Sequence, residues 1–134
     1  MANDNSAPHI DIMRSQLGRA RGLGAAKSGL HHWWMQRLTA LALAPLTLWF
    51  IYSVLVLQGA SHPVLLAWMG SPLNLVLLLA LIVATFHHMQ LGLQTVIEDY
   101  IHADRSRMIA LLAMKGATIL LALTAVVSAL KMGL

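Results

Sequence analysis

The 134-residue sequence contains no cysteine, and charged residues make up only 10% of it. The absence of cysteine excludes disulfides, covalent attachment of c-type haem, thiolate-bound zinc and an iron–sulfur cluster held by this chain alone. Soluble globular proteins carry about 25% charged residues. Residues 1–27 lack the apolar stretch of a signal peptide, so we expect no cleavage for export. The composition is therefore not that of an ordinary soluble domain or of a disulfide-stabilised secreted protein.

Apolar residues make up 58% of the sequence and gather in three long runs. The runs cover residues 38–57, 73–97 and 108–130. A helix of ~20 residues crosses a hydrocarbon core of ~30 Å. The sequence therefore predicts an all-α membrane protein, with a three-helix membrane anchor over residues 31–134 and a polar cytoplasmic N-terminal arm over residues 1–30. Pro45 lies inside the first run, where we expect a kink.

The basic residues indicate how the helices cross the membrane. Nine residues are Lys or Arg and five are Asp or Glu. Most basic residues precede the first run or lie between the second and third runs, which places the N-terminus inside and the C-terminus outside. Once these basic residues are explained as topology signals, no basic surface with interleaved aromatic residues remains for nucleic acid. Nucleic acid is therefore not an expected partner. We expect Trp33, Trp34 and Trp68 at the head groups.

Two histidines, His87 and His88, lie inside the second run, where an ionisable side chain is costly and commonly functional. Two polar stripes run along this helix at spacings of three or four residues. One stripe consists of Thr85, His88, Gly92, Thr95 and Asp99. The other consists of His87, Gln90, Gln94 and Glu98. Spacing alone leaves open which histidine faces the bundle, and a neutral histidine bonded to a neighbouring helix is the structural alternative. The space left by Gly92 favours His88.

A haem is the metal group that one imidazole at this depth fits best. Zinc or copper requires more nitrogen, sulfur or carboxylate donors than this helix face offers, whereas imidazole is the common axial ligand of b-type haem. The first and third runs contain no histidine. A bis-histidine haem therefore requires a second histidine from another subunit.

Polar residues also gather at the cytoplasmic ends of the first two spans. They are His31, His32 and Arg37 at the first span and Glu98, Asp99 and Tyr100 at the second. Because the first span begins on the side where the second ends, we expect these residues to share one interface, with cations and acids paired. A phenol, a carboxylate and a guanidinium can bind quinone carbonyls and relay protons. The cluster is a candidate quinone site, although polar residues are expected at any membrane interface.

Two motifs resemble the small hydrophobic membrane anchor, the D subunit, of succinate dehydrogenase (respiratory complex II). The first is His88-Met89-Gln90-Leu91-Gly92 followed by Asp99-Tyr100. The second is Gly29-Leu30-His31 followed by Arg37 and Thr39. The segment 21–29 is similar to the alphaproteobacterial and mitochondrial-like branch of this family.

The resemblance implies that His88 is one axial ligand of haem b, and that a companion cytochrome b subunit supplies the other. It also implies that His31 and Arg37 lie near the haem propionates, and that Tyr100 hydrogen-bonds ubiquinone with Asp99 close by. The implied partners are the cytochrome b companion anchor subunit, the iron–sulfur subunit, the flavoprotein subunit and membrane lipid.

The implied function is electron transfer from the iron–sulfur subunit to ubiquinone, in the tricarboxylic acid cycle and the respiratory chain, by a subunit that does not oxidise succinate alone. The implied location is the bacterial inner (plasma) membrane, with a cytoplasmic N-terminus and a periplasmic C-terminus. A quinol:fumarate reductase anchor would present a similar polar edge, and menaquinone is an alternative quinone. A small transport or proton-conducting subunit, or a purely structural subunit, would also have three apolar spans. Proton conduction is disfavoured because the first and third spans offer almost no ionisable residue apart from Lys115.

Overall fold

The computed structural model describes residues 27–134, so most of the expected N-terminal arm, residues 1–26, lies outside the described residues. The described chain folds into the helices α2 (Lys27–Val56), α3 (His62–Met69), α4 (Pro72–Tyr100) and α5 (Asp104–Gly133). Three of these helices, α2, α4 and α5, are long and apolar enough to cross a membrane. The predicted all-α fold with three membrane spans is confirmed.

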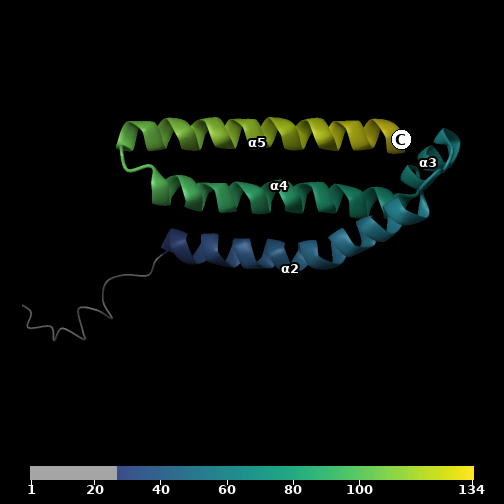
Figure 1. The fold of residues 1–134 in the computed structure, drawn as a ribbon, viewed down its shortest axis with the longest axis horizontal. Helices are drawn as coiled ribbons and strands as arrows, with labels where there is room; N and C mark the ends of the chain where they lie inside the picture. The colour runs from purple at the N-terminus through teal and green to yellow at the C-terminus, as the bar shows by residue number, and fades with distance from the viewer. Residues whose placement is uncertain (1–26) are drawn as a thin grey trace, which may run out of the picture.

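The three long helices lie side by side, with α4 in the middle (Figure 1). Within residues 27–134, α4 packs against both α2 and α5, whereas α2 and α5 do not contact each other. Helices α2 and α5 each have 30 residues, which corresponds to ~45 Å at 1.5 Å per residue. This length exceeds a hydrocarbon core of ~30 Å, so the helix ends reach the head-group regions.

Helix α2 begins at Lys27, well before the apolar run at residue 38. The polar residues before the apolar run belong to this same helix. The helical repeat therefore fixes on which side of α2 each of them lies. Pro45 lies within α2 and lacks the N–H that would bond the carbonyl four residues earlier. Past its middle the helix turns toward α4 (Figure 1), in agreement with the expected kink.

A short helix that the sequence does not predict, α3, occupies the connection between α2 and α4. It follows Ser61, has proline in its first turn and ends before Gly70. Proline is well suited to this position because the first N–H groups of a helix have no intrahelical partner. The ring of Trp68 in α3 stacks on the ring of Trp49 in α2, with centroids 5.7 Å apart and planes at 19°. Trp68 therefore packs α3 against α2. The sequence predicts only a place at the head groups for this residue and does not predict the contact with α2.

Helices α4 and α5 are antiparallel neighbours because only residues 101–103 separate them.

At the opposite end of these two helices, the end of α5 has a glycine, Gly133, in a tightly packed position. A Cβ added to Gly133 would lie 2.8 Å from Leu75 Cδ1 and 3.0 Å from the Met69 carbonyl oxygen. The missing side chain of Gly133 thus lets the end of α5 approach α3 and the start of α4 closely.

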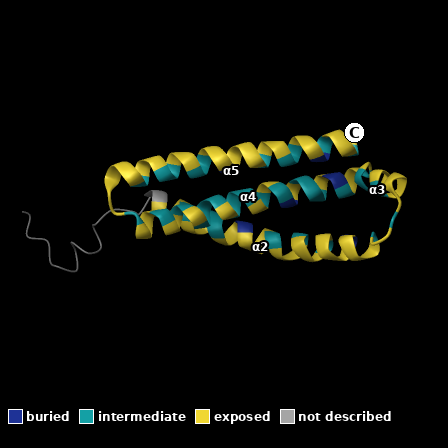
Figure 2. Cartoon of the chain, turned by 45° about the horizontal axis from the view of Figure 1, so that its top comes forward, coloured by how far each residue is buried: buried dark blue, intermediate teal, exposed yellow. Residues whose placement is uncertain are grey.

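Little of the described chain is buried (Figure 2). Among residues 29–134, the buried apolar side chains are Leu75, Leu81 and Ala129. The outer faces of the three long helices are lined instead by exposed leucine, valine and isoleucine. Such faces suit a chain that lipid or other subunits cover, because large apolar surfaces are unfavourable in water and commonly mark contacts with proteins or membranes.

Candidate functional site

A groove of about 640 Å³ lies between the first half of α2 and the second half of α4. We call it the Gly92 groove. It is lined by Gly29, His32, Trp33, Gln36, Arg37, Gly92, Thr95 and Val96. Its volume falls within the range of ~300–1,000 Å³ that is usual for ligand sites.

His88 lies beside this groove and faces α2. Its Nδ1 is 3.0 Å from Thr39 Oγ1, and its Nε2 is 3.4 Å from Gln36 Nε2. Gln36 lines the groove, so its flexible amide is the group that a ligand would displace to reach His88 Nε2 from the groove. His88 is thus hydrogen-bonded to a neighbouring helix, as the structural alternative expects, and also lies next to a space that could hold a ligand.

Gly92 is not required by packing between the helices of this chain. A Cβ added there would meet Gln36 Nε2 at 3.6 Å, which is an ordinary van der Waals contact. Glycine costs up to about 1 kcal/mol in a helix relative to alanine. The space beside His88 is therefore available to a group from outside the described chain.

His87 also borders α2, but from a position about 100° around α4 from His88. It borders an apolar groove of about 380 Å³ together with Met35, Leu38, Thr39, Ala42, Ala80, Val83 and Ala84. Its Nε2 is buried without a hydrogen-bond partner among the described residues. The two histidines therefore face different surroundings. His88 contacts the polar side chains of Thr39 and Gln36 beside the Gly92 groove, whereas His87 borders a groove lined almost entirely by apolar side chains.

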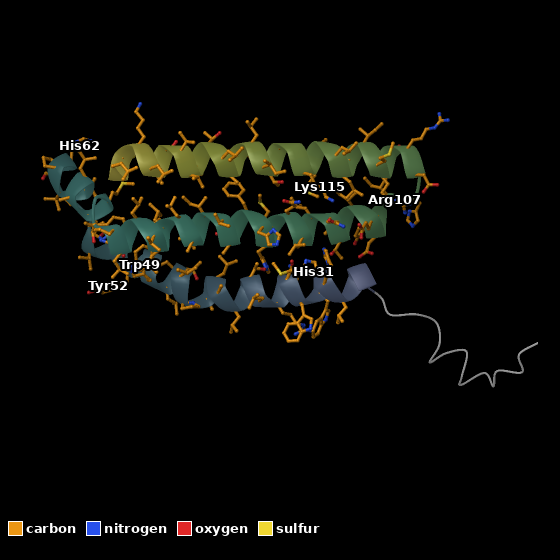
Figure 3. All side chains as sticks on the ribbon, turned by 180° about the vertical axis from the view of Figure 1, so that it is seen from behind. His31, Trp49, Tyr52, His62, Arg107 and Lys115 are labelled. Carbon is orange, nitrogen blue, oxygen red and sulfur yellow. The ribbon has the colours of Figure 1, made fainter. Side chains whose placement is uncertain are left out.

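The structure separates His31 from Arg37. Arg37 and His32 line the Gly92 groove, whereas the exposed His31 does not. Figure 3 marks His31 on the first part of α2. The histidine that the fold places in the groove with Arg37 is thus His32, whose Nε2 is buried without a partner in the described chain.

The expected pairing of cations with acids at the ends of α2 and α4 is wrong. Arg37 instead stacks on Trp33, with its Cζ 4.2 Å from the ring centroid. Glu98 accepts a hydrogen bond from Gln94 Nε2 at 2.8 Å. The guanidinium of Arg37 reaches an aromatic ring one turn away on α2, and a cation over such a ring is stabilised without a carboxylate.

Asp99 and Tyr100 lie at the end of α4, past the residues that line the groove. Each lies one helical turn after a groove residue, Asp99 after Thr95 and Tyr100 after Val96. Tyr100 is the last residue of α4 and is 79% exposed. Along α4, His88, the groove residues and the Asp99-Tyr100 pair thus follow one another in order, and neither Asp99 nor Tyr100 lines the groove.

Sequence reasoning missed Gln36, and it considered Thr39 only as part of a motif. Both contact His88. The missed signal was a stripe on the first helix. His32, Gln36 and Thr39 are spaced by four and three residues, which puts them on one helical face. The predicted span begins at residue 38, whereas the helix begins at Lys27 and includes all three residues.

Residues 11–126 match the family described as succinate dehydrogenase/fumarate reductase transmembrane subunit. The chain belongs to this family. The anchor is 36% identical over 107 residues to the succinate dehydrogenase hydrophobic membrane anchor subunit of Rickettsia bellii, covering 80% of the anchor and 86% of that protein. It is 31% identical over 88 residues to the succinate dehydrogenase membrane anchor subunit of Reclinomonas americana, covering 63% and 73%. No solved structure matches the anchor.

These likenesses confirm the predicted resemblance. The anchor is a multi-pass membrane subunit of succinate dehydrogenase, an oxidoreductase complex, and membership of that complex implies partner subunits. No group of three or more His, Cys, Asp or Glu side chains that could hold a metal ion occurs in the part of the chain that the structure describes. The imidazoles of His88 and His32 therefore lie at or beside the groove without belonging to a larger cluster of metal-ligating side chains in that part of the chain.

Proposed function

We propose that the anchor binds haem b jointly with a companion cytochrome b subunit, and that it forms part of a ubiquinone site fed with electrons by the iron–sulfur subunit. The proposed setting is the bacterial inner membrane, with the N-terminus cytoplasmic and the C-terminus periplasmic. The observation that carries the proposal is the position of His88, held between two helices beside a groove whose walls contain unpartnered polar atoms.

The residues around the groove fit a haem. The imidazole of His88 can bind iron through Nε2, and the guanidinium of Arg37 can pair with a propionate carboxylate. Two groove residues, His32 and Gln36, each have a buried polar atom without a partner in the described chain. A bound polar group would satisfy such atoms, which otherwise cost free energy. When bound, haem supplies an iron centre that accepts and returns one electron.

The role proposed for Tyr100 is hydrogen-bond donation to a quinone carbonyl. A phenol is a donor at neutral pH, and the 79% exposure of Tyr100 leaves its hydroxyl accessible to a group from outside the chain. Asp99 precedes it at the end of α4. Its carboxylate would orient the site or pass a proton from the cytoplasmic side. His31 keeps its predicted place near the propionates only if a partner subunit brings them to its side of α2.

The test is a reduced-minus-oxidised absorbance spectrum of the purified native complex. A b-type haem band that depends on His88 supports the proposal. A complex without such a band would favour a purely structural anchor, or a proton-conducting subunit if vesicles that contain it leak protons. Quinone reduction and quinol oxidation rates measured with ubiquinone and menaquinone distinguish the succinate dehydrogenase direction from that of a quinol:fumarate reductase.

A further inference from the structure

Thr39 is one of the few buried residues of α2, with 8% of its surface exposed. Its hydroxyl lies where α2 faces α4, and it contacts Nδ1 of His88 at 3.0 Å. The two residues are 49 positions apart in the sequence. This contact is therefore made by the tertiary fold and does not belong to either helix alone.

The other hydrogen bonds of Thr39 indicate which of the two residues donates the proton in its contact with His88. The hydroxyl lies 2.7 Å from the Met35 carbonyl oxygen and 3.1 Å from that of Gln36, and donates to these acceptors. A hydroxyl has one proton, and we assign it to the shortest of these contacts, the 2.7 Å bond to Met35, so that Thr39 Oγ1 accepts from His88. In this assignment Nδ1 of His88 carries the proton, and Nε2 of the neutral imidazole keeps its lone pair, which faces the displaceable amide of Gln36 at 3.4 Å.

We propose that Thr39 is a positioning residue, which holds the ring of His88 in the tautomer and orientation that present Nε2 beside the Gly92 groove. The inference rests on the proposed haem function, because Nε2 is the atom that would bind iron. Metal-binding histidines generally donate their second ring N–H to a fixed acceptor, which sets the tautomer and raises the basicity of the ligand. Here the acceptor comes from the same chain as the ligand.

A helical threonine bonded to a carbonyl four residues earlier is common and would not by itself indicate such a role. Thr47 makes the same bond in α2, to Leu43, and Thr118 makes it in α5, to Met114. Thr118 is also buried, with 4% of its surface exposed. Only Thr39 among these three adds a contact with a histidine, so Thr47 and Thr118 provide matched controls.

The experiment compares Thr39→Val and Thr39→Ser with Thr47→Val and Thr118→Val in the whole purified complex. The readouts are the g-values of the oxidised haem, which report ring orientation, its midpoint potential and the ratio of haem to flavin. We expect Thr39→Val to shift the g-values, to raise the midpoint potential and to weaken haem binding about tenfold. The potential rises because an imidazole that no longer donates from Nδ1 is a weaker ligand for oxidised iron. Thr39→Ser and both controls should resemble the wild type.

A second pair keeps the test decisive if Thr39→Val does not assemble. Thr39→Ser and Thr39→Ala both lack the methyl group and differ only in the hydroxyl. Equal g-values and equal midpoint potentials in this pair would overturn the proposal. Nitrogen-15 chemical shifts of His88 provide a readout that does not need haem, and Nδ1 should be the protonated nitrogen in the wild type but not uniquely so in Thr39→Ala. A wild-type complex without haem refutes the proposed function, whereas a haem that is indifferent to the hydroxyl refutes only the role of Thr39.

Discussion

Single residues decide what the second span can bind, and the histidine doublet illustrates this most clearly. His87 and His88 are chemically identical neighbours, yet one borders an apolar groove and the other contacts Thr39 beside the Gly92 groove. A helix rotation of about 100° separates the two environments. Ligand assignment is therefore a question of helix face, and it can be tested by comparing the two histidines directly.

Replacing His88 with alanine is expected to remove most of the b-type absorbance of the complex or to shift its midpoint potential, because the iron loses an axial ligand. His87→Ala is the matched control and should retain both properties. Haem content per flavin and a redox titration provide the measurement. The opposite ranking of the two variants would assign the haem to the apolar groove.

Replacing Tyr100 with phenylalanine removes one oxygen from a side chain that is 79% exposed, so assembly and haem content should survive. Loss of one hydrogen bond of ~0.5–1.5 kcal/mol corresponds to a decrease of up to about tenfold in ubiquinone reductase kcat/KM. Electron transfer from succinate to an artificial acceptor at the soluble centres should persist.

Tyr52 offers the control for this prediction, since it is 67% exposed and lies near the other end of α2. Tyr52→Phe should reduce ubiquinone at the wild-type rate. If Tyr100→Phe, fully assembled, also has wild-type ubiquinone kinetics, then Tyr100 merely anchors the helix at the head groups.

At the scale of elements, α3 makes close contacts with α2, with the start of α4 and with the end of α5. The stacked rings of Trp49 and Trp68 join α2 to α3. Gly133 admits the side chain of Leu75 and the carbonyl of Met69 on the other side. This end of the molecule lies far from the Gly92 groove, so its contacts should affect stability without affecting the groove.

Gly133→Ala is expected to destabilise the anchor by roughly 1–3 kcal/mol, because the new Cβ would lie 2.8 Å from Leu75 Cδ1 and force it to move. Gly116→Ala in the same helix is the control. No atom lies within 4 Å of a Cβ added there, so this change should be neutral or stabilise the helix by up to about 1 kcal/mol. Thermal unfolding of the detergent-solubilised complex measures both. Equal midpoints for the two variants would contradict the packing described for Gly133.

At the scale of the whole molecule, the anchor is a row of three helices with little core of its own. In the described chain α2 and α5 are held together only through α4 and α3. Both broad faces of this row are open to other molecules (Figure 2). An anchor of this shape gains its stability from neighbouring subunits and lipid as well as from its own contacts.

The absence of cysteine makes the predicted orientation directly testable, because single introduced cysteines can be labelled without background. Ser61 and Ser106 are both exposed and lie at opposite ends of the helices. With the N-terminus cytoplasmic, a membrane-impermeant maleimide should label Ser61→Cys in intact spheroplasts. It should label Ser106→Cys only after permeabilisation. The reverse pattern would invert the topology.

The sequence by itself determined the number, order and approximate extent of the membrane spans, because hydropathy and length are properties of continuous segments. It also singled out His88, Gly92, Asp99 and Tyr100, since their spacing lies within one helix. It did not reveal α3, whose eight residues are too few to stand out from a connection.

Only the tertiary structure decided which faces of different helices meet. It placed Thr39 and Gln36 against His88. It placed His32, and not His31, in the groove. It also placed Arg37 over the ring of Trp33 and not beside an acid. The physical reason is that helices apolar on nearly all sides carry little information about their own rotation. That rotation is set by close contacts between helices, which join residues far apart in the sequence.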